Sequence, residues 1–258
     1  MKTTSYIIFG IIGFIIAFFA FSAFYTTFIY TPENRFQYIN LTDNPVQTQL
    51  AGDVHTIRLV SPDESGMLSV DMRPFPGVWI TQCDSVTETT VEYAKGWGDN
   101  LSCSLLDGVL SLEISTQFNS QNMTFMKGNP MPIKITIPNG LTTIDNQLEY
   151  WGNPSIMGVT ADKLYITCRE SNYFRNCHIK TVYVNHNDKP GDTHSGRYTF
   201  KFDTEIDTFY ISSTSYEYIS LFTDSTSVVR QMELRRPAGN VEINIEGDNL
   251  LNLSRVKI

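Results

Sequence analysis

Past residue 52 the sequence is a succession of short runs in which apolar and polar residues alternate. Alternation with a period of two is typical of a strand that buries one face and exposes the other. Gly, Pro, Asn or Asp residues bound most of these runs, as expected of strands joined by turns. No run beyond the first thirty residues has helical apolar spacing over ten positions, so the pattern predicts a nearly all-β domain. The predicted strands are 55–61, 67–72, 78–83, 89–94, 108–115, 133–137, 141–144, 163–168, 180–184, 197–202, 207–212, 217–222, 228–234 and 240–246.

The stretch 133–146, IKITIPNGLTTIDN, predicts a corner between two strands. Pro138 presets a backbone angle that a turn requires, and Gly140 adopts a positive φ at little cost. The two alternations around this corner can then direct the same set of aliphatic side chains towards one interior. That set is Ile133, Ile135, Ile137, Leu141 and Ile144.

A strand that bends at a corner and continues is how a coil of stacked strands is built. In such a coil each turn of the chain depends on its neighbours for burial, so several turns are needed. We therefore predict an all-β, stacked-strand, β-solenoid-like domain. Because no strict repeat length is visible, a β-sandwich or a barrel remains the alternative.

Two segments resemble a known family of bacterial envelope proteins. They are LLDGVLSLEIS, residues 105–115, and MPIKITIPNGLTTIDN, residues 131–146. Together they are similar to the core signature of the head-GIN-type, adhesin-like β-solenoid group, over about residues 55–258. The Gly-Ser-Gly-rich corners frequent in that group are absent here. The resemblance implies a β-solenoid fold and an envelope location, and it implies little about activity.

The first thirty residues differ from the rest of the chain. No charged side chain lies between Lys2 and Glu33, and residues 7–24 are almost continuously apolar. Eighteen apolar residues are about the minimum for crossing a bilayer, and Tyr6 and Tyr25 lie where interfacial aromatic residues are expected. We predict one transmembrane helix within residues 6–30. A cleaved signal peptide is the alternative, although the apolar run is longer than a usual signal core.

This assignment divides the chain into an anchor (1–30), a polar linker (31–52) and an extracytoplasmic β-domain (53–258). Lys2 and the amino terminus are the only positive charges before the apolar run, which favours a cytoplasmic amino terminus. The predicted location is therefore a bacterial membrane, with most of the chain periplasmic or extracellular.

Four cysteines, all beyond the apolar segment, could form two disulfides in an oxidising compartment. Three pairings are possible, and the one between sequence neighbours closes the smallest loops: Cys83–Cys103 with Cys168–Cys177. Four buried thiols are the alternative. Zinc is disfavoured because the spacings match no familiar ligand pattern.

Composition limits the possible partners and chemistry. The chain has 258 residues, a formal net charge of -8 and no basic stripe, so nucleic acid is not expected as a partner. No glycine-rich phosphate loop follows a strand, and we predict no cofactor. The polar stretch 184–196 contains two histidines, but its Asn, Asp, Pro and Gly residues favour an ordinary loop over a metal site.

Candidate functional residues are few. Trp97 lies between glycines in a polar turn, and Tyr150 and Trp151 lie at another corner, where exposed rings could bind a sugar or a protein. The alternative is that each ring folds back to cover an end or seam of the core. Scattered carboxylates such as Glu170, Asp203 and Glu205 leave an envelope polysaccharide hydrolase as the alternative function. The sequence predicts a non-catalytic, membrane-anchored binding or scaffolding protein of the bacterial envelope, with an envelope protein or glycan as partner.

Overall fold

The structure is a computed structural model that describes residues 2–24, 36–40, 44–60, 77–114, 123–127, 131–148, 154–168, 171–186, 194–212, 216–235, 242–247 and 255–257. Apart from helix α1 (Lys2–Phe24) and the short 3-10 helix η3 (Lys95–Asn100), the described elements are strands. The all-β prediction is therefore confirmed. The predicted strand at 67–72 lies outside the described residues.

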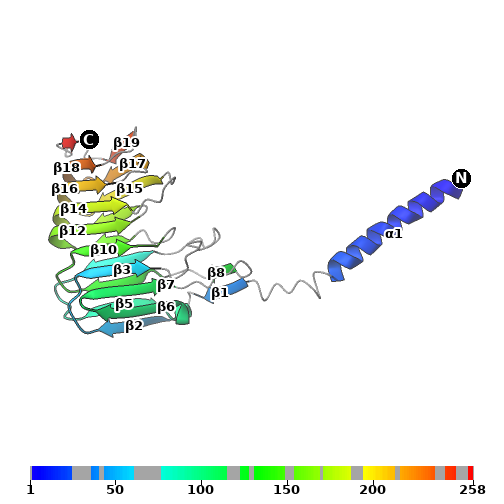
Figure 1. Cartoon of the computed structure of the whole chain (residues 1–258), viewed down its shortest axis with the longest axis horizontal. Helices are drawn as coiled ribbons and strands as arrows, with labels where there is room; N and C mark the ends of the chain where they lie inside the picture. Colours follow the sequence, from blue (N-terminus) through cyan, green and yellow to red (C-terminus); the bar gives the residue numbers. More distant parts are fainter. Residues whose placement is uncertain are drawn as a thin grey trace.

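Two nine-stranded sheets stack their strands along one axis (Figure 1). Sheet 1 contains, in spatial order, β20 (Arg255–Lys257), β18 (Val228–Arg235), β16 (Glu205–Ser212), β14 (His178–His186), β12 (Thr160–Cys168), β10 (Thr143–Asn146), β3 (Thr56–Val60), β7 (Val109–Ile114) and β6 (Leu101–Leu106). Sheet 2 contains β19 (Glu242–Gly247), β17 (Tyr216–Thr223), β15 (His194–Lys201), β13 (Asn172–Arg175), β11 (Ser155–Met157), β4 (Val78–Gln82), β9 (Ile133–Ile137), β5 (Thr89–Ala94) and β2 (Pro45–Leu50).

From β9 onward, consecutive strands alternate between the two sheets. Each strand from β11 to β18 pairs in parallel with the strand two places further along the chain, so the chain advances as a coil. The parallel register distinguishes this coil from a sandwich of hairpin-connected antiparallel strands. Antiparallel pairs occur only at the amino-terminal end of the described sheets. There β5 pairs with β2 and β9, and β6 pairs with β7.

The earlier strands β3 and β4 are inserted into the coil. Strand β4 lies between β9 and β11 in sheet 2, and β3 lies between β7 and β10 in sheet 1. Residues far apart in sequence thus share neighbouring positions, as in the pairs Ile80–Ile135 and Ile57–Ile144. The amino-terminal and carboxyl-terminal halves of the domain therefore form one continuous core.

That core fills the space between the sheets. The five aliphatic residues predicted to face one interior are all at most 1% exposed, and Gly140 has φ of +116° at the predicted corner. Further along the coil aromatic rings take over: Phe174 stacks on Phe200 at 5.2 Å, and Phe209 meets both edge-on. Fully burying a side chain of this size stabilises the fold by about 1.5–3 kcal/mol.

The predicted linker at 31–52 contains strands. Strand β1 (Phe36–Asn40) pairs with β8 (Met123–Lys127), and β2 pairs with β5 at the edge of sheet 2. Part of the predicted linker therefore belongs to sheet 2. Strand β2 was missed because PVQTQL has a weak apolar alternation and its residues are exposed or half-buried, so its backbone pairing defines the strand.

Helix α1 coincides with the predicted apolar segment and stands apart from the sheets in Figure 1. Its last three turns expose large apolar side chains on every side: Phe14, Ile15, Ile16, Phe18, Phe19, Phe21 and Phe24. Measured over the described part of the chain, no helix has the combined length and hydropathy of a membrane span.

Candidate binding surface

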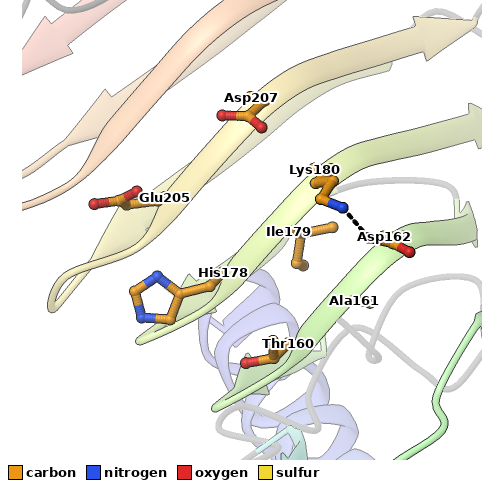
Figure 2. A pocket seen from close by; sticks show the side chains of 8 residues that line it. All are labelled: Thr160, Ala161, Asp162, His178, Ile179, Lys180, Glu205 and Asp207. Atoms are coloured by element: carbon orange, nitrogen blue, oxygen red, sulfur yellow. Dashed lines mark ion pairs between the residues drawn. The ribbon is translucent and has the colours of Figure 1, made fainter.

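The outer face of sheet 1 carries a shallow, open depression of about 450 Å³ (Figure 2). It lies where β12, β14 and β16 begin, and its lining is mainly charged and polar. The lining residues are Thr160, Ala161, Asp162, His178, Ile179, Lys180, Glu205 and Asp207.

An irregularity repeated in four strands shapes this depression. In β12, β14, β16 and β18 two consecutive side chains near the start face outward, and the first of the two is skipped in the register between strands. This shared irregularity interrupts the regular alternation of inward and outward side chains without shifting the register. The skipped residues form a column of alternating charge: Asp162, Lys180, Asp207 and Arg230.

The charges in this column neutralise one another. Lys180 Nζ lies 2.5 Å from Asp162 Oδ1, and Arg230 lies 3.1 Å from Asp207 and 3.4 Å from Glu205. Hydrogen bonding to Lys180 lowers the pKa of Asp162, and the same bond raises the pKa of Lys180. Both groups are fully exposed, so the pair contributes little to stability.

This geometry does not favour glycoside hydrolysis. A general acid needs a carboxyl group whose pKa is raised, usually by burial. The pKa of Asp162 is instead lowered, and Glu205 and Asp207 share one arginine. Of the other suggested carboxylates, Asp203 lies at the exposed corner before β16, and Glu170 lies outside the described residues.

Beside the charged column, three tyrosines form a stacked ladder across sheet 1. Tyr165, Tyr183 and Tyr210 occupy equivalent positions in β12, β14 and β16. Each neighbouring pair of rings stacks with centroids 4.9 Å apart and planes within 9° of parallel. The parallel register therefore turns three separate residues into one rigid aromatic surface.

The ladder presents ring edges and hydroxyl groups outward. Ring faces inside the stack cover one another, and the guanidinium group of Arg235 lies 4.1 Å from the Tyr210 centroid. At the other end Tyr165 is 45% exposed, because its neighbour on β10 is the small Thr143. Small polar side chains flank the ladder on both sides: Thr167, Asn185 and Ser212 on one, and Thr181 and Thr208 on the other.

The tyrosine ladder was not predicted from the sequence, although the sequence contains a signal for it. Each tyrosine is the centre of an apolar-Tyr-apolar triplet: Leu-Tyr-Ile at 164–166, Val-Tyr-Val at 182–184 and Phe-Tyr-Ile at 209–211. The flanking residues are buried, which forces each tyrosine outward. Aligning the three strands by these triplets would have predicted the stack.

Trp97 is not an exposed binding residue, and the alternative that its ring covers the core is correct. Its side chain is completely buried, because η3 crosses from β5 in sheet 2 to β6 in sheet 1 and folds the indole into the core. A polar turn with glycines was expected to expose the ring, but the end of a coil needs a large apolar side chain to cover it. Tyr150 and Trp151 lie outside the described residues.

The predicted disulfides are also wrong, since none of the four cysteines forms a disulfide. In the register Thr160 pairs with His178, so Cys177 lies beside the start of β12, whereas Cys168 ends that strand. Nine residues of strand separate the two by about 30 Å, far beyond the ~7 Å between Cα atoms that a disulfide allows. Cys83 follows a strand of sheet 2, and Cys103 lies in sheet 1.

The thiols have distinct environments. Burial raises the pKa of Cys103 and of Cys177 to about 11. A hydrogen bond from the Ser85 side chain lowers the pKa of Cys83, which makes it the most nucleophilic of these three.

The histidines do not gather into a metal site. His178 lies in the depression, and buried His186 contacts the Tyr198 hydroxyl at 2.5 Å. Among the residues that the structure places, no group of three or more His, Cys, Asp or Glu side chains could hold a metal ion. Most of the polar loop around residue 190 lies outside that part.

No protein-family model matches this sequence, and no curated protein matches it. Among solved structures, a "putative adhesin" from Bacteroides fragilis is similar with a TM-score of 0.42 and 14% identity, over 85% of this chain and 99% of that chain. A "putative lipid binding protein" from Parabacteroides distasonis has a TM-score of 0.40 and 11% identity, over 86% of this chain and 100% of that chain. A "putative adhesin" from Parabacteroides merdae has a TM-score of 0.37 and 10% identity, over 86% of this chain and 99% of that chain.

At these identities and TM-scores the similarity supports no conclusion about function, and the head-GIN resemblance stays a prediction. The class that the structure itself defines is a two-sheet β-coil whose outer face displays a rigid aromatic ladder.

Proposed function

We propose that this protein is a non-catalytic binding protein of the bacterial envelope and that it binds a protein partner through the tyrosine ladder of sheet 1. The observation that carries this proposal is the stack of Tyr165, Tyr183 and Tyr210, held rigid by the parallel register. A flat, preorganised surface loses little conformational entropy when it binds.

The composition of this surface supports a protein partner. Tyrosine supplies a large contact area at a low entropic cost, and neighbouring Ser, Thr and Asn side chains supply adaptable hydrogen bonds. The columns beside the ladder contain these residue types, including Thr167, Asn185 and Ser212. Tyrosine is also enriched among the residues that contribute most to the affinity of protein interfaces.

We further propose that α1 anchors the protein in a bacterial membrane, with the β-coil outside the cytoplasm. The support is the apolar run 7–24, the exposed apolar side chains of α1 and the positive charge of Lys2 before the run. The cysteines give no support to an oxidising compartment, because none of them forms a disulfide.

Binding can be tested with the full-length protein in detergent, applied to immobilised envelopes of the producing bacterium. The variant Tyr165→Ser/Tyr183→Ser/Tyr210→Ser should bind at least about tenfold more weakly, because it loses the central aromatic contacts. Tyr218→Ser, which removes a half-buried tyrosine from the outer face of sheet 2, is the matched control and should bind normally. Treating the envelopes with protease should abolish binding.

Unchanged binding by the triple variant, despite a thermal unfolding curve showing that it folds, would contradict the proposed surface. Binding that survives proteolysis of the envelopes would contradict a protein partner. For the anchor, protease added to intact spheroplasts should digest the β-coil, whereas full protection would place the coil in the cytoplasm.

A further inference from the structure

The outer face of sheet 2 has a different organisation from that of sheet 1. One column across its strands alternates aromatic and small side chains. The column runs through Trp79, Ser155, Tyr173, Thr199 and Phe222. Because neighbouring strands lie about 4.8 Å apart, Tyr173 and Phe222 are separated by about 9.6 Å.

The small residues show how the rings lie. Thr199 faces outward between inward-facing Tyr198 and Phe200, yet it is only 5% exposed. Ser155 has the same outward position next to Trp79 and Tyr173, and it is 8% exposed. The rings on either side therefore lean over the small residues instead of standing edge-on as in the tyrosine ladder.

Cations flank this aromatic column on both sides. Arg175 and Lys201 are register neighbours on one side, and exposed Arg197 lies on the other. Four residues of strand separate Arg197 from Lys201, a distance of about 13 Å. The aromatic pair Tyr173 and Phe222 thus lies between two positively charged borders.

Aromatic rings hold two of these cations in place. The Arg175 guanidinium carbon lies 5.5 Å from the Phe202 centroid, and Lys201 Nζ lies 5.2 Å from the Phe222 centroid. A ring attracts a cation through its quadrupole and carries no net charge, so the positive charge is retained. Carboxylate partners, as on sheet 1, would have cancelled it.

Within the described part of the chain, no carboxylate pairs with Arg175, Arg197 or Lys201, and Arg175 Nε is a buried donor without an acceptor. The nearby carboxylates have other partners. Glu246, on the edge strand, accepts a hydrogen bond from the Asn244 amide. Asp224, at the corner, accepts one from the Phe202 backbone N–H at 2.8 Å.

The backbone conformation of Phe202 also indicates that this surface is held in a defined arrangement. It has φ of +57° and is 58% exposed, although a bulky residue rarely adopts that backbone conformation. Such a conformation persists only where the surroundings stabilise it. Here it places the ring under the Arg175 guanidinium.

We propose that this surface, which we term the cation face (Tyr173, Arg175, Arg197, Lys201 and Phe222), binds a linear acidic polysaccharide. Aromatic rings that lean over a sheet can stack on the C–H faces of sugar rings, and the unneutralised cations can pair with carboxylates along the same chain. A polyphosphate has no C–H faces that could stack on the aromatic rings of this surface.

The cation face is on the opposite sheet from the tyrosine ladder, so this inference does not depend on the proposed protein partner. It assigns the domain a second, glycan-binding surface.

The test uses the full-length protein in detergent and immobilised polygalacturonate, with its fully methyl-esterified form as the neutral control. The wild type should bind polygalacturonate, weaken as salt is added, and bind the ester at least about tenfold more weakly. Arg175→Gln/Lys201→Gln should lose about tenfold in affinity and part of the salt dependence. Lys163→Gln removes an exposed, unpaired cation from sheet 1 and should bind as the wild type does.

A second variant, Tyr173→Ser, tests the aromatic contribution and should weaken binding while leaving the salt dependence unchanged. Thermal unfolding of each variant establishes that it folds. Equal losses in Lys163→Gln and Arg175→Gln/Lys201→Gln, or equal binding of the ester, would overturn the proposal. Tighter binding to phosphatidylglycerol vesicles than to polygalacturonate, through the same residues, would overturn it in favour of lipid.

Discussion

The two outer faces of the coil differ in how they hold their charges. On sheet 1 the cations Arg58, Lys180, Arg230 and Arg235 each pair with a carboxylate. On sheet 2 Arg175 and Lys201 lie over aromatic rings, and Arg197 is exposed. One coil with one shared core therefore supports a face on which these four cations are neutralised and a face on which, beside the Lys134–Glu92 ion pair, three cations keep their positive charge available.

The aromatic side chains differ in the same way. Adjacent strands of sheet 1 each contribute a tyrosine, so the rings stack on one another and expose their edges. On sheet 2 a small residue separates each aromatic side chain from the next, and the rings lean over it. Since strand spacing is the same in both sheets, the choice of residue at alternate positions decides which part of a ring faces solvent.

The largest expected effect comes from a change that breaks both faces at once. Gly158 lies at a corner with φ of +66°, and a Cβ there would lie 2.8 Å from the Gln82 carbonyl oxygen. Gly158→Val should destabilise the domain by about 3 kcal/mol or more, because it adds this clash to left-handed strain. Chemical unfolding monitored by circular dichroism measures the loss.

Asn176 is the matched control, since it occupies the equivalent corner one turn further along, with φ of +49°. Asn176→Gly should change stability by less than about 1 kcal/mol, because asparagine tolerates this conformation. A Gly158→Val protein as stable as the wild type would show that the corner is built differently.

A smaller loss is expected within the tyrosine ladder. Tyr183 stacks on two rings, whereas Tyr165 stacks on one. Tyr183→Ser should cost about 1–3 kcal/mol beyond lost burial and Tyr165→Ser about half as much, since each ring pair contributes about 0.5–1.5 kcal/mol. Urea unfolding gives both values. Equal losses would mean that the stack does not form as a unit.

The smallest effect concerns the charged column. Hydrogen bonding and Coulomb attraction couple Asp162 to Lys180, so a double-mutant cycle with Asp162→Asn and Lys180→Gln should give a small favourable coupling at pH 7. The pKa of Asp162 is depressed, so this stability is present above about pH 3.8 and is lost as the pH falls through the lower folded value. The coupling should also disappear in high salt. A coupling that persists at pH 2 would exclude an ionic origin.

The parts of the fold that depend on local patterns could be predicted from the sequence. The corner from Ile133 to Asn146 was predicted because Pro138, Gly140 and five alternating aliphatic residues all lie within fourteen positions. Most strands of the coil were found for the same reason. Strands β11 and β13 were missed because three or four residues are too few to show a period.

The surfaces could not be predicted because they depend on register between distant strands. Tyr165 and Tyr210 are 45 positions apart, and only the stacking of β12, β14 and β16 brings them into one ladder. The sequence left Trp97 open between exposure and burial, because its burial depends on the end of the coil, which no local pattern reveals. The disulfide prediction failed for the same reason. It paired Cys168 with Cys177 because they are close in sequence, but the register places them at opposite ends of neighbouring strands.

The most direct test of the contrast between the two faces compares matched triple variants of the full-length protein. Arg175→Gln/Arg197→Gln/Lys201→Gln and Lys180→Gln/Arg230→Gln/Arg235→Gln change the net charge equally, one on each sheet. Affinity for polygalacturonate should fall by about a hundredfold in the sheet 2 variant and stay within about twofold of the wild type in the sheet 1 variant. Equal losses in the two variants would show that overall charge governs binding, and would contradict the claim that the cations of the cation face are available while Lys180, Arg230 and Arg235 are not.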